Sequence, residues 1–135
     1  MQVSVVTPDA TFFQGEARQV ILPATDGEMG ILSGHAPLIG VLGYGVVRIA
    51  EPNKDKKTLV AVYGGFVKVQ DDQVNVLAGG AATAEGTVDE ARKAVEEAQK
   101  ALSAAITAGD AAGVTESTET LKRARARLSL QQLAA

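Results

Sequence analysis

Apolar and polar residues alternate in short runs through the first 82 positions, with the period of two that is typical of strands. Val67 and Val69, for example, alternate with Lys68 and Gln70. Gly, Pro, Asn and Asp interrupt these runs, and Asp71-Asp72 suits a tight hairpin turn. The pattern predicts eight strands, over residues 2–7, 11–14, 17–22, 29–32, 45–50, 57–63, 66–70 and 73–78. Strands this short and numerous indicate an antiparallel β-sandwich or flattened barrel.

The period changes to three and four residues after position 86, which is typical of an amphipathic helix. Thr87 is a candidate N-cap, and Glu90 follows at the spacing of a capping box. Gly109 suits a left-handed C-terminal cap, and a second helix is expected from about Val114. The apolar stripe of the first helix comprises Val88, Ala91, Val95, Ala98, Leu102 and Ala105. The tail is therefore predicted to be a two-helix antiparallel hairpin.

Composition divides the chain at the same place. All four prolines, all five aromatic residues and twelve of the fourteen glycines precede Thr87. We therefore expect a β-sandwich domain over residues 1–84 and a helical hairpin over residues 85–135. The stripe of the hairpin is mostly alanine, which removes little apolar area from water, at roughly 25 cal/mol per Å². Two alternatives follow for the hairpin: it detaches from the sandwich, or it stays docked throughout.

Charge and composition exclude several classes of partner. The net charge of −3 is mild, and no basic face is interleaved with aromatic residues, so nucleic acid is not expected. The chain has no cysteine, which excludes disulfides and thiolate-bound metal. No apolar run approaches the roughly 20 residues that cross a bilayer, and Met1 leads directly into a strand pattern. We therefore expect no direct insertion into a membrane.

Candidate catalytic chemistry is sparse. The single histidine, His35, follows Asp26 and Glu28, but no Ser or Cys nucleophile motif accompanies it, and no cluster has the spacing of metal ligands. Gly64-Gly65 lacks the lysine and the following helix of a phosphate-binding loop, so a bulge or a close crossing of strands is expected there. A small β-sandwich enzyme is therefore disfavoured, and His35 is expected to stabilise a turn or an interface.

Three segments carry a resemblance to a known family: Val3-Ser4-Val5-Val6-Thr7-Pro8, the turn from Gly27 to Leu38 (GEMGILSGHAPL), and Gly64-Gly65-Phe66-Val67-Lys68-Val69. Over nearly its whole length the chain resembles the epsilon subunit of the rotary, proton-driven F-type ATP synthase. The resemblance implies a non-catalytic rotor subunit whose sandwich clamps the gamma subunit to the ring of c subunits. It implies a hairpin that permits turnover when folded and inhibits ATP hydrolysis when extended along gamma. It also implies a peripheral location, through the complex, at the cytoplasmic face of the bacterial membrane.

The same resemblance implies roles for residues 27–38. The carboxylate of Glu28 is expected at the end of the sandwich that meets polar loops of the rotor ring. The residues expected at or near the surface shared with the ring and gamma are Ile31, Leu32, His35 and Leu38. The alternative interpretation of Glu28 is an ordinary solvated loop acid.

The start of the first helix, from Val88 to Lys93, is similar to the motif with which some bacterial epsilon subunits bind ATP. The resemblance implies nucleotide contacts for Asp89 and Arg92, and for Arg123 and Arg127 on the second helix. The positions that depart from the family pattern are Thr83, Lys93 and Gln99. An ATP-sensing regulatory module, with no other cofactor, is the alternative to the rotor role, and an ion pair on the helix surface is the structural alternative for Asp89 and Arg92.

Four cations cluster on the second helix with no opposite charge expected nearby: Lys122, Arg123, Arg125 and Arg127. The resemblance implies that this basic run extends along gamma and faces acidic segments of the alpha and beta catalytic subunits. Contacts of that kind set position and weaken with salt. The alternative is a solvated helix end whose cations satisfy the helix dipole.

Overall fold

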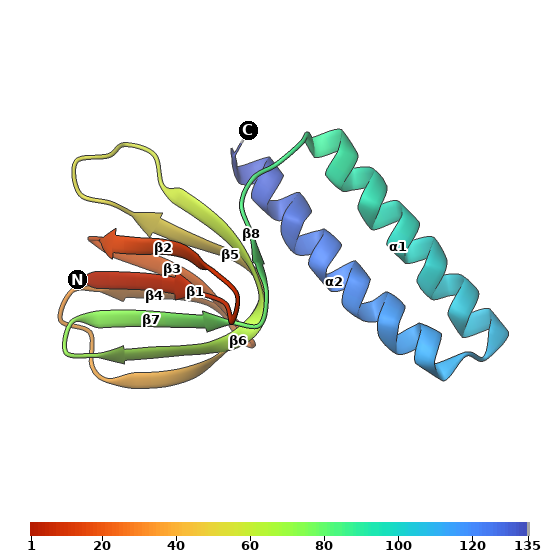
Figure 1. Cartoon of the computed structure of the whole chain (residues 1–135), viewed down its shortest axis with the longest axis horizontal. Coiled ribbons are helices and arrows are strands. Elements are labelled where there is room, and N and C mark those ends of the chain that lie inside the picture. The colour runs from red at the N-terminus through yellow and green to blue at the C-terminus, as the bar shows by residue number, and fades with distance from the viewer. Residues whose placement is uncertain (135) are drawn as a thin grey trace.

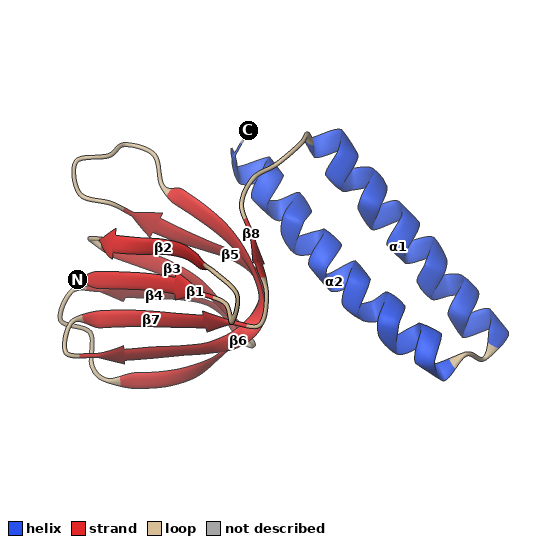
Figure 2. Ribbon diagram, in the orientation of Figure 1, coloured by secondary structure: helices blue, strands red, loops and turns tan. Residues whose placement is uncertain are grey.

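One eight-stranded sheet folds over on itself and is followed by two long antiparallel helices (Figure 1). The computed structural model describes residues 1–134. The elements are β1 (Gln2–Val6), β2 (Thr11–Glu16), β3 (Gln19–Ala24), β4 (Gly27–Leu32), β5 (Leu38–Ala50), β6 (Thr58–Gln70), β7 (Gln73–Ala78), β8 (Ala81–Ala82), α1 (Val88–Ala108) and α2 (Ala111–Ala134). Figure 2 shows the strands gathered on one side and both helices on the other. The predicted fold class, a β-sandwich followed by a helical hairpin, is confirmed.

The strand order produces two layers that share two long strands. The order is β2-β1-β7-β6-β5-β3-β4, with β8 paired to β6, and the only parallel pair among the described strands is β1 with β7. β5 and β6 each contain 13 residues. The last residues of β6 pair with β7, whereas the last residues of β5 pair with β3. Each long strand therefore contributes one half to each layer.

β6 bends at Gly64-Gly65, where the sequence predicted two separate strands over 57–63 and 66–70. Gly64 and Gly65 have φ angles of 73° and 124°, a left-handed conformation that glycine adopts without strain. A Cβ atom on Gly65 would lie 2.1 Å from the carbonyl oxygen of Leu77 in β7, so only glycine fits at this point. The sequence predicted a bulge or a close crossing of strands here, and the structure has a close approach between the paired strands β6 and β7. Because pairing with β5 continues on both sides of the bend, the two predicted strands are one.

β5 begins at Leu38, seven residues before the predicted start at residue 45. Gly40 and Gly43 lie in the missed half, and glycine weakens the sequence signal of a strand. Gly43 has a packing reason, since a Cβ atom there would lie 3.1 Å from the carbonyl oxygen of Ala24 in β3. The short β8 was not predicted at all, because two alanines carry no alternation.

The core lies between the two layers and follows the predicted alternation. Val67 and Val69 of β6 are buried while Lys68 between them is exposed. The buried core comprises Met1, Val3, Val5, Ala17, Val20, Leu22, Ile31, Leu42, Val47, Ile49, Val60, Val62, Val67, Val69, Val74, Val76 and Ala78. Every member precedes the helices, so the sandwich holds a core of its own.

The helices begin and end at the predicted caps. The side chain of Thr87 accepts a hydrogen bond of 3.2 Å from the backbone N–H of Glu90, and Gly109 ends α1 with φ of 67°. The six stripe positions predicted for α1 are the six that are not exposed to solvent. α2 begins three residues before the predicted Val114, because Asp110 accepts a hydrogen bond of 3.0 Å from the N–H of Gly113 and so starts the helix earlier.

α2 lies between the sandwich and α1 (Figure 1). Leu130 is its fully buried anchor on the sheet, where it packs with Val46 and Ala61. The side-chain amide of Gln131 donates to the carbonyl oxygen of Glu85 and ties the end of α2 to the connection between the two parts. Neither α1 nor α2 combines the length and apolar character that crossing a bilayer requires.

Candidate functional site

Four large apolar side chains are exposed on the outer face of the sandwich: Ile39 and Val41 of β5, Phe66 of β6 and Leu77 of β7. We call these four residues the apolar row. Val41 stands opposite Phe66, and Phe66 stands opposite Leu77, so three members are direct cross-strand neighbours. Each member is between 52% and 75% exposed. Contiguous exposed apolar residues of this kind typically mark a surface that contacts another protein.

Sequence reasoning did not single out the apolar row. Ile39 and Val41 lie in the half of β5 that was not predicted as a strand. Phe66 and Leu77 lie in predicted strands, but each has a buried valine beside it, Val67 and Val76. The available signal was the alternation of Ile39 and Val41 with glycine and leucine, which marks one face of a strand.

Glu28 lies on β4 with its side chain exposed, and it forms an ion pair with Arg48 of β5. It also borders a small cleft that is lined by the last turns of α2, including Ser129 and Leu133. Arg48 lines the same cleft, next to the end of the helical hairpin. Glu28 is therefore near the hairpin as well as on the surface.

The other interface residues predicted around Glu28 divide into two groups. Leu32 is exposed and Leu38 is half-buried, so both reach the surface. Ile31 does not, and its expected place at or near the shared surface is wrong. It stands opposite Val20 of β3 and is fully buried in the core, because alternation along β4 turns residue 31 inward when Glu28 and Leu32 point outward.

His35 stabilises a turn at the opposite end of β4 from Glu28. Its backbone N–H donates to the carbonyl oxygen of Leu32 over 3.1 Å, and its ring Nδ1 lies 2.8 Å from the carbonyl oxygen of Ala36. The N–H of Gly34 and the hydroxyl of Ser33 both donate to Asp72, at 3.0 and 2.9 Å. These bonds hold the pKa of Asp72 below its ordinary value, the Gly34 N–H contributing most. The turn is thus bonded to the β6–β7 turn, and His35 and Glu28 share no pocket.

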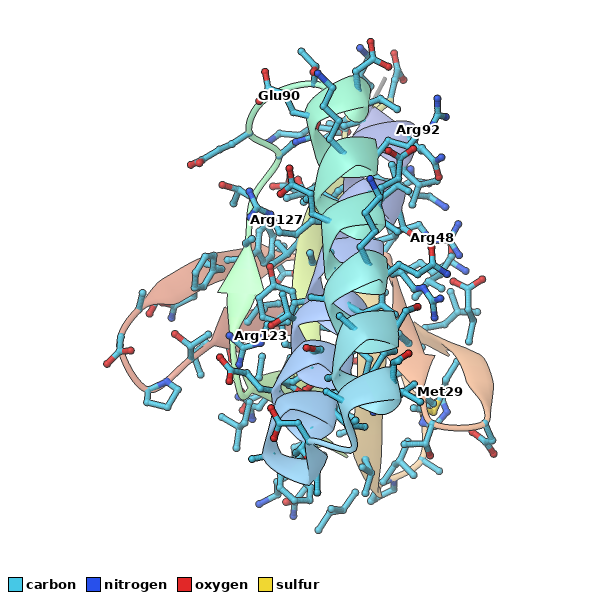
Figure 3. All side chains as sticks on the ribbon, turned by 90° about the vertical axis from the view of Figure 1, so that its right-hand side faces the viewer. Met29, Arg48, Glu90, Arg92, Arg123 and Arg127 are labelled. Carbon is cyan, nitrogen blue, oxygen red and sulfur yellow. The ribbon has the colours of Figure 1, made fainter. Side chains whose placement is uncertain are left out.

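A cleft of about 1130 Å³ opens between the two helices and the sandwich, beside the contact of α2 with the sheet. Arg123 and Arg127 line it, together with Thr83 and three carboxylate side chains, Glu85, Glu90 and Glu97. Asp89 and Arg92 do not line it; both are exposed on α1, and Figure 3 shows Arg92 on the side of the helix away from Arg123 and Arg127. The structure therefore brings together two of the four residues that the nucleotide motif implied. Asp89 and Arg92 form no salt bridge with each other in the described chain.

Two of the four cations of the basic run contact tyrosines of the sandwich, although all four are exposed to solvent. The guanidinium carbon of Arg123 lies 5.1 Å from the ring centroid of Tyr63, and Lys122 Nζ lies 5.5 Å from that of Tyr44. The expectation that no opposite charge is nearby is wrong, because Arg123 Nε donates to Glu119 Oε1 over 3.1 Å, one helical turn earlier. Arg125 and Arg127 are exposed. Lys122 and Arg123 thus have partners on the sheet, and Arg127 lines the cleft beside it.

Two tyrosines and one carboxylate complete this contact. The hydroxyl of Tyr44 donates to Glu119, and the two tyrosine rings lie 6.2 Å apart. Burial, and then the Glu119 carboxylate, raise the pKa of Tyr44, whereas the hydrogen bond from Tyr44 lowers the pKa of Glu119. Burial also raises the pKa of Tyr63, against the opposing effect of Arg127 and Arg123. Glu119 is therefore held in its charged form and Tyr44 in its neutral, donating form.

Within residues 1–134 no three His, Asp or Glu side chains gather closely enough to hold a metal ion. What the described surface offers is contact: an apolar row on a rigid sheet, an exposed acid beside an arginine, and a helix held on the sheet by polar groups.

Comparison with known proteins agrees with this description. Residues 1–84 match the family model described as the ATP synthase delta/epsilon chain, beta-sandwich domain. The chain is 44% identical to the ATP synthase epsilon chain of Gloeothece citriformis over 128 residues, which are 94% of this chain and 91% of that protein. It is 42% identical to the epsilon chain of Acaryochloris marina over 130 residues, covering 95% and 92%. A chain of the Euglena gracilis mitochondrial ATP synthase shares the fold, with a TM-score of 0.79 at 22% identity over 98% of this chain and 80% of that one.

Proposed function

The chain belongs to the ATP synthase delta/epsilon chain family, and we propose that it is the epsilon subunit of the central stalk, which couples the c-ring to gamma during proton-driven ATP synthesis. The observation that carries this proposal is the apolar row on the outer face of the sandwich. Exposure of four large apolar side chains to water is unfavourable, and a partner that covers them lowers the free energy.

We assign the apolar row to the contact with gamma. The row runs straight across β5, β6 and β7, so it presents a flat, fixed surface rather than a mobile loop. The buried core directly beneath it, including Val67 and Val76, resists deformation because protein interiors are packed as densely as organic crystals. A subunit that transmits torque requires both properties.

We assign Glu28 to the contact with the ring, with Leu32, His35 and Leu38, which lie at or beyond the other end of β4, as further candidates. Arg48 supports this role, since the ion pair restricts the directions in which the exposed carboxylate of Glu28 points. Such a charge at the rim of an interface sets orientation and contributes little to affinity.

The division of labour follows the division of the chain. Residues 1–84 form the coupling part, and residues 85–135 form a regulatory hairpin whose basic run, when extended along gamma, contacts the alpha and beta subunits and slows ATP hydrolysis. The protein has no catalytic role of its own and is attached to the cytoplasmic face of the bacterial membrane through the complex.

ATP hydrolysis by the cognate catalytic complex, stripped of this subunit, tests the proposal. The whole chain, or a chain that ends at Gly86, is added back. The whole chain is expected to slow hydrolysis while the shorter chain binds gamma without slowing it. If both bind and act alike, the regulatory role fails and the coupling role survives. If neither binds gamma, the assignment to the stalk is wrong.

A substitution pair tests the surface itself. Phe66→Asp places a charge in the middle of the apolar row and is expected to weaken binding to gamma more than about tenfold. Ile106→Asp is the matched control, because Ile106 is also exposed but lies near the end of α1. Equal affinities for the two variants would exclude the apolar row as the gamma contact.

A nucleotide-sensing role is the second candidate, and one observation favours it: Arg123 and Arg127 line the same cleft as Tyr63. The three carboxylates of that cleft, and the distance of Asp89 and Arg92 from it, count against tight binding of a polyanion. Calorimetric titration of the isolated chain with ATP, with Arg127→Ala as the comparison, distinguishes the two roles. The rotor role alone predicts no heat of binding at micromolar ATP.

A further inference from the structure

Five side chains from three elements meet where α2 crosses the sheet. Tyr44 of β5 and Tyr63 of β6 lie on the sandwich, and Glu119, Lys122 and Arg123 lie on consecutive turns of α2. Glu119 accepts from Tyr44 and from Arg123, so one carboxylate serves both parts of the molecule. Each cation lies over one tyrosine ring, at 5.5 Å for Lys122 and 5.1 Å for Arg123. The hydrogen bonds and cation–π contacts among these five residues are therefore made within the group, and Arg127 lies beside Tyr63 at its edge.

The apolar contact beside this group is small. Leu130 is the large, fully buried residue of α2, and its cluster on the sheet contains only Val46 and Ala61, with half-buried neighbours around them. The other buried apolar residues of α2 are Leu121, Ala124 and Ala126. α1 lies on the far side of α2 from the sheet. Hydrogen bonds to charged groups typically contribute more than neutral ones. The polar group therefore supplies a substantial part of what holds the hairpin in place.

We propose that Tyr44, Tyr63, Glu119, Lys122 and Arg123 form a latch that holds the helical hairpin on the sandwich. The latch itself depends only on the described contacts, whereas its consequence for ATP hydrolysis rests on the proposed function. In the docked state two of the four cations of the basic run contact the sheet, so an extended hairpin requires the latch to open first. In the docked state Arg125 is exposed, and Arg127 lies beside Tyr63 and lines the cleft.

The charges around Glu119 agree with this assignment. Lys122 and Arg123 on α2 favour its carboxylate form, and Tyr44 on β5 donates to it, which together lower its pKa. Tyr63 on β6 faces Arg123 and Arg127, both of which favour its ionised form, but burial keeps it neutral. The directions of these pKa shifts keep Glu119 charged and both tyrosines neutral at neutral pH, as the contacts require.

Native-state hydrogen exchange of the full chain tests the latch without any partner subunit. An alanine-rich helical hairpin is marginal in water by itself, so the amides of α2 exchange when the hairpin leaves the sheet. Tyr44→Phe removes one hydroxyl and keeps the ring, and Glu119→Gln removes one charge at constant size. Each is expected to accelerate exchange at residues 121–130 about tenfold, while the amides of β6 and β7 stay unchanged.

Glu116→Gln is the matched control, since Glu116 is an exposed acid one turn earlier on the same helix, with no salt bridge in the described chain. It is expected to leave exchange unchanged. The double variant Tyr44→Phe/Glu119→Gln is expected to exchange no faster than the worse single variant, because both remove the same bond. Unchanged exchange in both single variants, or equal acceleration by Glu116→Gln, overturns the latch.

Hydrolysis by the reconstituted complex separates the latch from the proposed function. If the latch variants open in hydrogen exchange and also inhibit more strongly than the parent chain, both proposals are supported. If they open while hydrolysis is unaffected, the latch is supported and the regulatory role of the hairpin is not. Hydrogen exchange therefore tests the latch, and hydrolysis separately tests the regulatory role of the hairpin.

Discussion

The sandwich and the hairpin are held by different physics. Seventeen buried residues from the strands and their connections form the core of the sandwich, and no ionised side chain is among them. The hairpin docks through a cluster with three buried members and through a group of five polar or aromatic side chains. Apolar burial responds weakly to pH and salt, whereas charge-assisted contacts respond to both. Docking of the hairpin is thus expected to respond to pH and salt more strongly than the core of the sandwich does.

The largest effect is expected from the core of the sandwich. Ile31→Ala removes a fully buried side chain and leaves a cavity between the layers, so the free energy of unfolding is expected to fall by about 4 kcal/mol. Urea unfolding followed by far-UV circular dichroism measures it. Ile39→Ala is the matched control at a position that is 75% exposed, where the change is expected within about 0.5 kcal/mol. Similar decreases in the free energy of unfolding for Ile31→Ala and Ile39→Ala would contradict the difference between a buried and an exposed position.

The bend in β6 is expected to give the second-largest effect. Gly65→Ala places a Cβ atom 2.1 Å from the carbonyl oxygen of Leu77 and forces a φ of 124° on alanine. The strain is expected to cost about 3 kcal/mol of unfolding free energy. Gly27→Ala, also at positive φ but with nothing within 4 Å of its Cβ atom, shows how much of that cost is backbone strain alone. Equal costs would mean that the close crossing contributes nothing.

Leu130→Ala sharpens the comparison, because it addresses the hairpin and spares the core of the sandwich. We expect docking to weaken by about 2 kcal/mol, near the low end for leucine, since the cluster around Leu130 is small. Faster hydrogen exchange in α2, with unchanged exchange in β6 and β7, is the expected signature. Leu133→Ala is the control, as Leu133 is about half exposed near the end of the same helix. If both parts exchange faster together, the hairpin and sandwich unfold as one unit.

The smallest effect is expected from acid. The pKa of Glu119 is lower in the folded chain than in the unfolded chain, so its contribution is complete above the ordinary carboxyl value of 4.5 and is lost as pH falls through the lowered pKa. Both tyrosines lie in the latch and the chain has no tryptophan, so intrinsic fluorescence reports on the docked hairpin.

A fluorescence change is therefore expected below about pH 4.5, ahead of any change in far-UV circular dichroism. The change is expected to vanish in Glu119→Gln. Because the pKa of Asp72 is also lowered, at the far end of the sandwich, the dichroism signal follows the separate weakening of that region. A fluorescence change that persists in Glu119→Gln would assign the acid response to another carboxyl group.

The sequence predicted the elements whose signals are local. The cap at Thr87, the stripe of α1 and the strand over residues 73–78 depend on neighbours within a few positions, and the structure has all three. The first half of β5 was missed because its glycines conceal the alternation. The sequence predicted two strands in place of β6 because two consecutive glycines usually end a strand. Here the pairing with β5 continues on both sides of Gly64-Gly65, so the strand is not interrupted.

The candidate sites depend on residues far apart in the sequence, and this explains the remaining errors. The apolar row requires knowledge of which face of three strands is covered. The latch joins Tyr44 to Glu119 across 75 positions, and no local pattern predicts that pairing. The same holds for the tyrosine partners of Lys122 and Arg123, whereas the pair of Glu119 and Arg123 has the local spacing of i and i+4. Ile31 was assigned to an interface by its motif, although alternation from Glu28 already turned it inward.

The long strands β5 and β6 have a mechanical consequence. Since both cross from one layer to the other as continuous chain, a shearing force on the outer layer reaches the inner layer along covalent bonds as well as across packed side chains. Along that edge the two layers are covalently continuous and do not depend on side-chain packing alone to stay together. The hairpin, by contrast, is joined through the short connection from Thr83 to Thr87 and stands outside this load path. A movement of the hairpin would therefore leave the path of force through β5 and β6 unchanged.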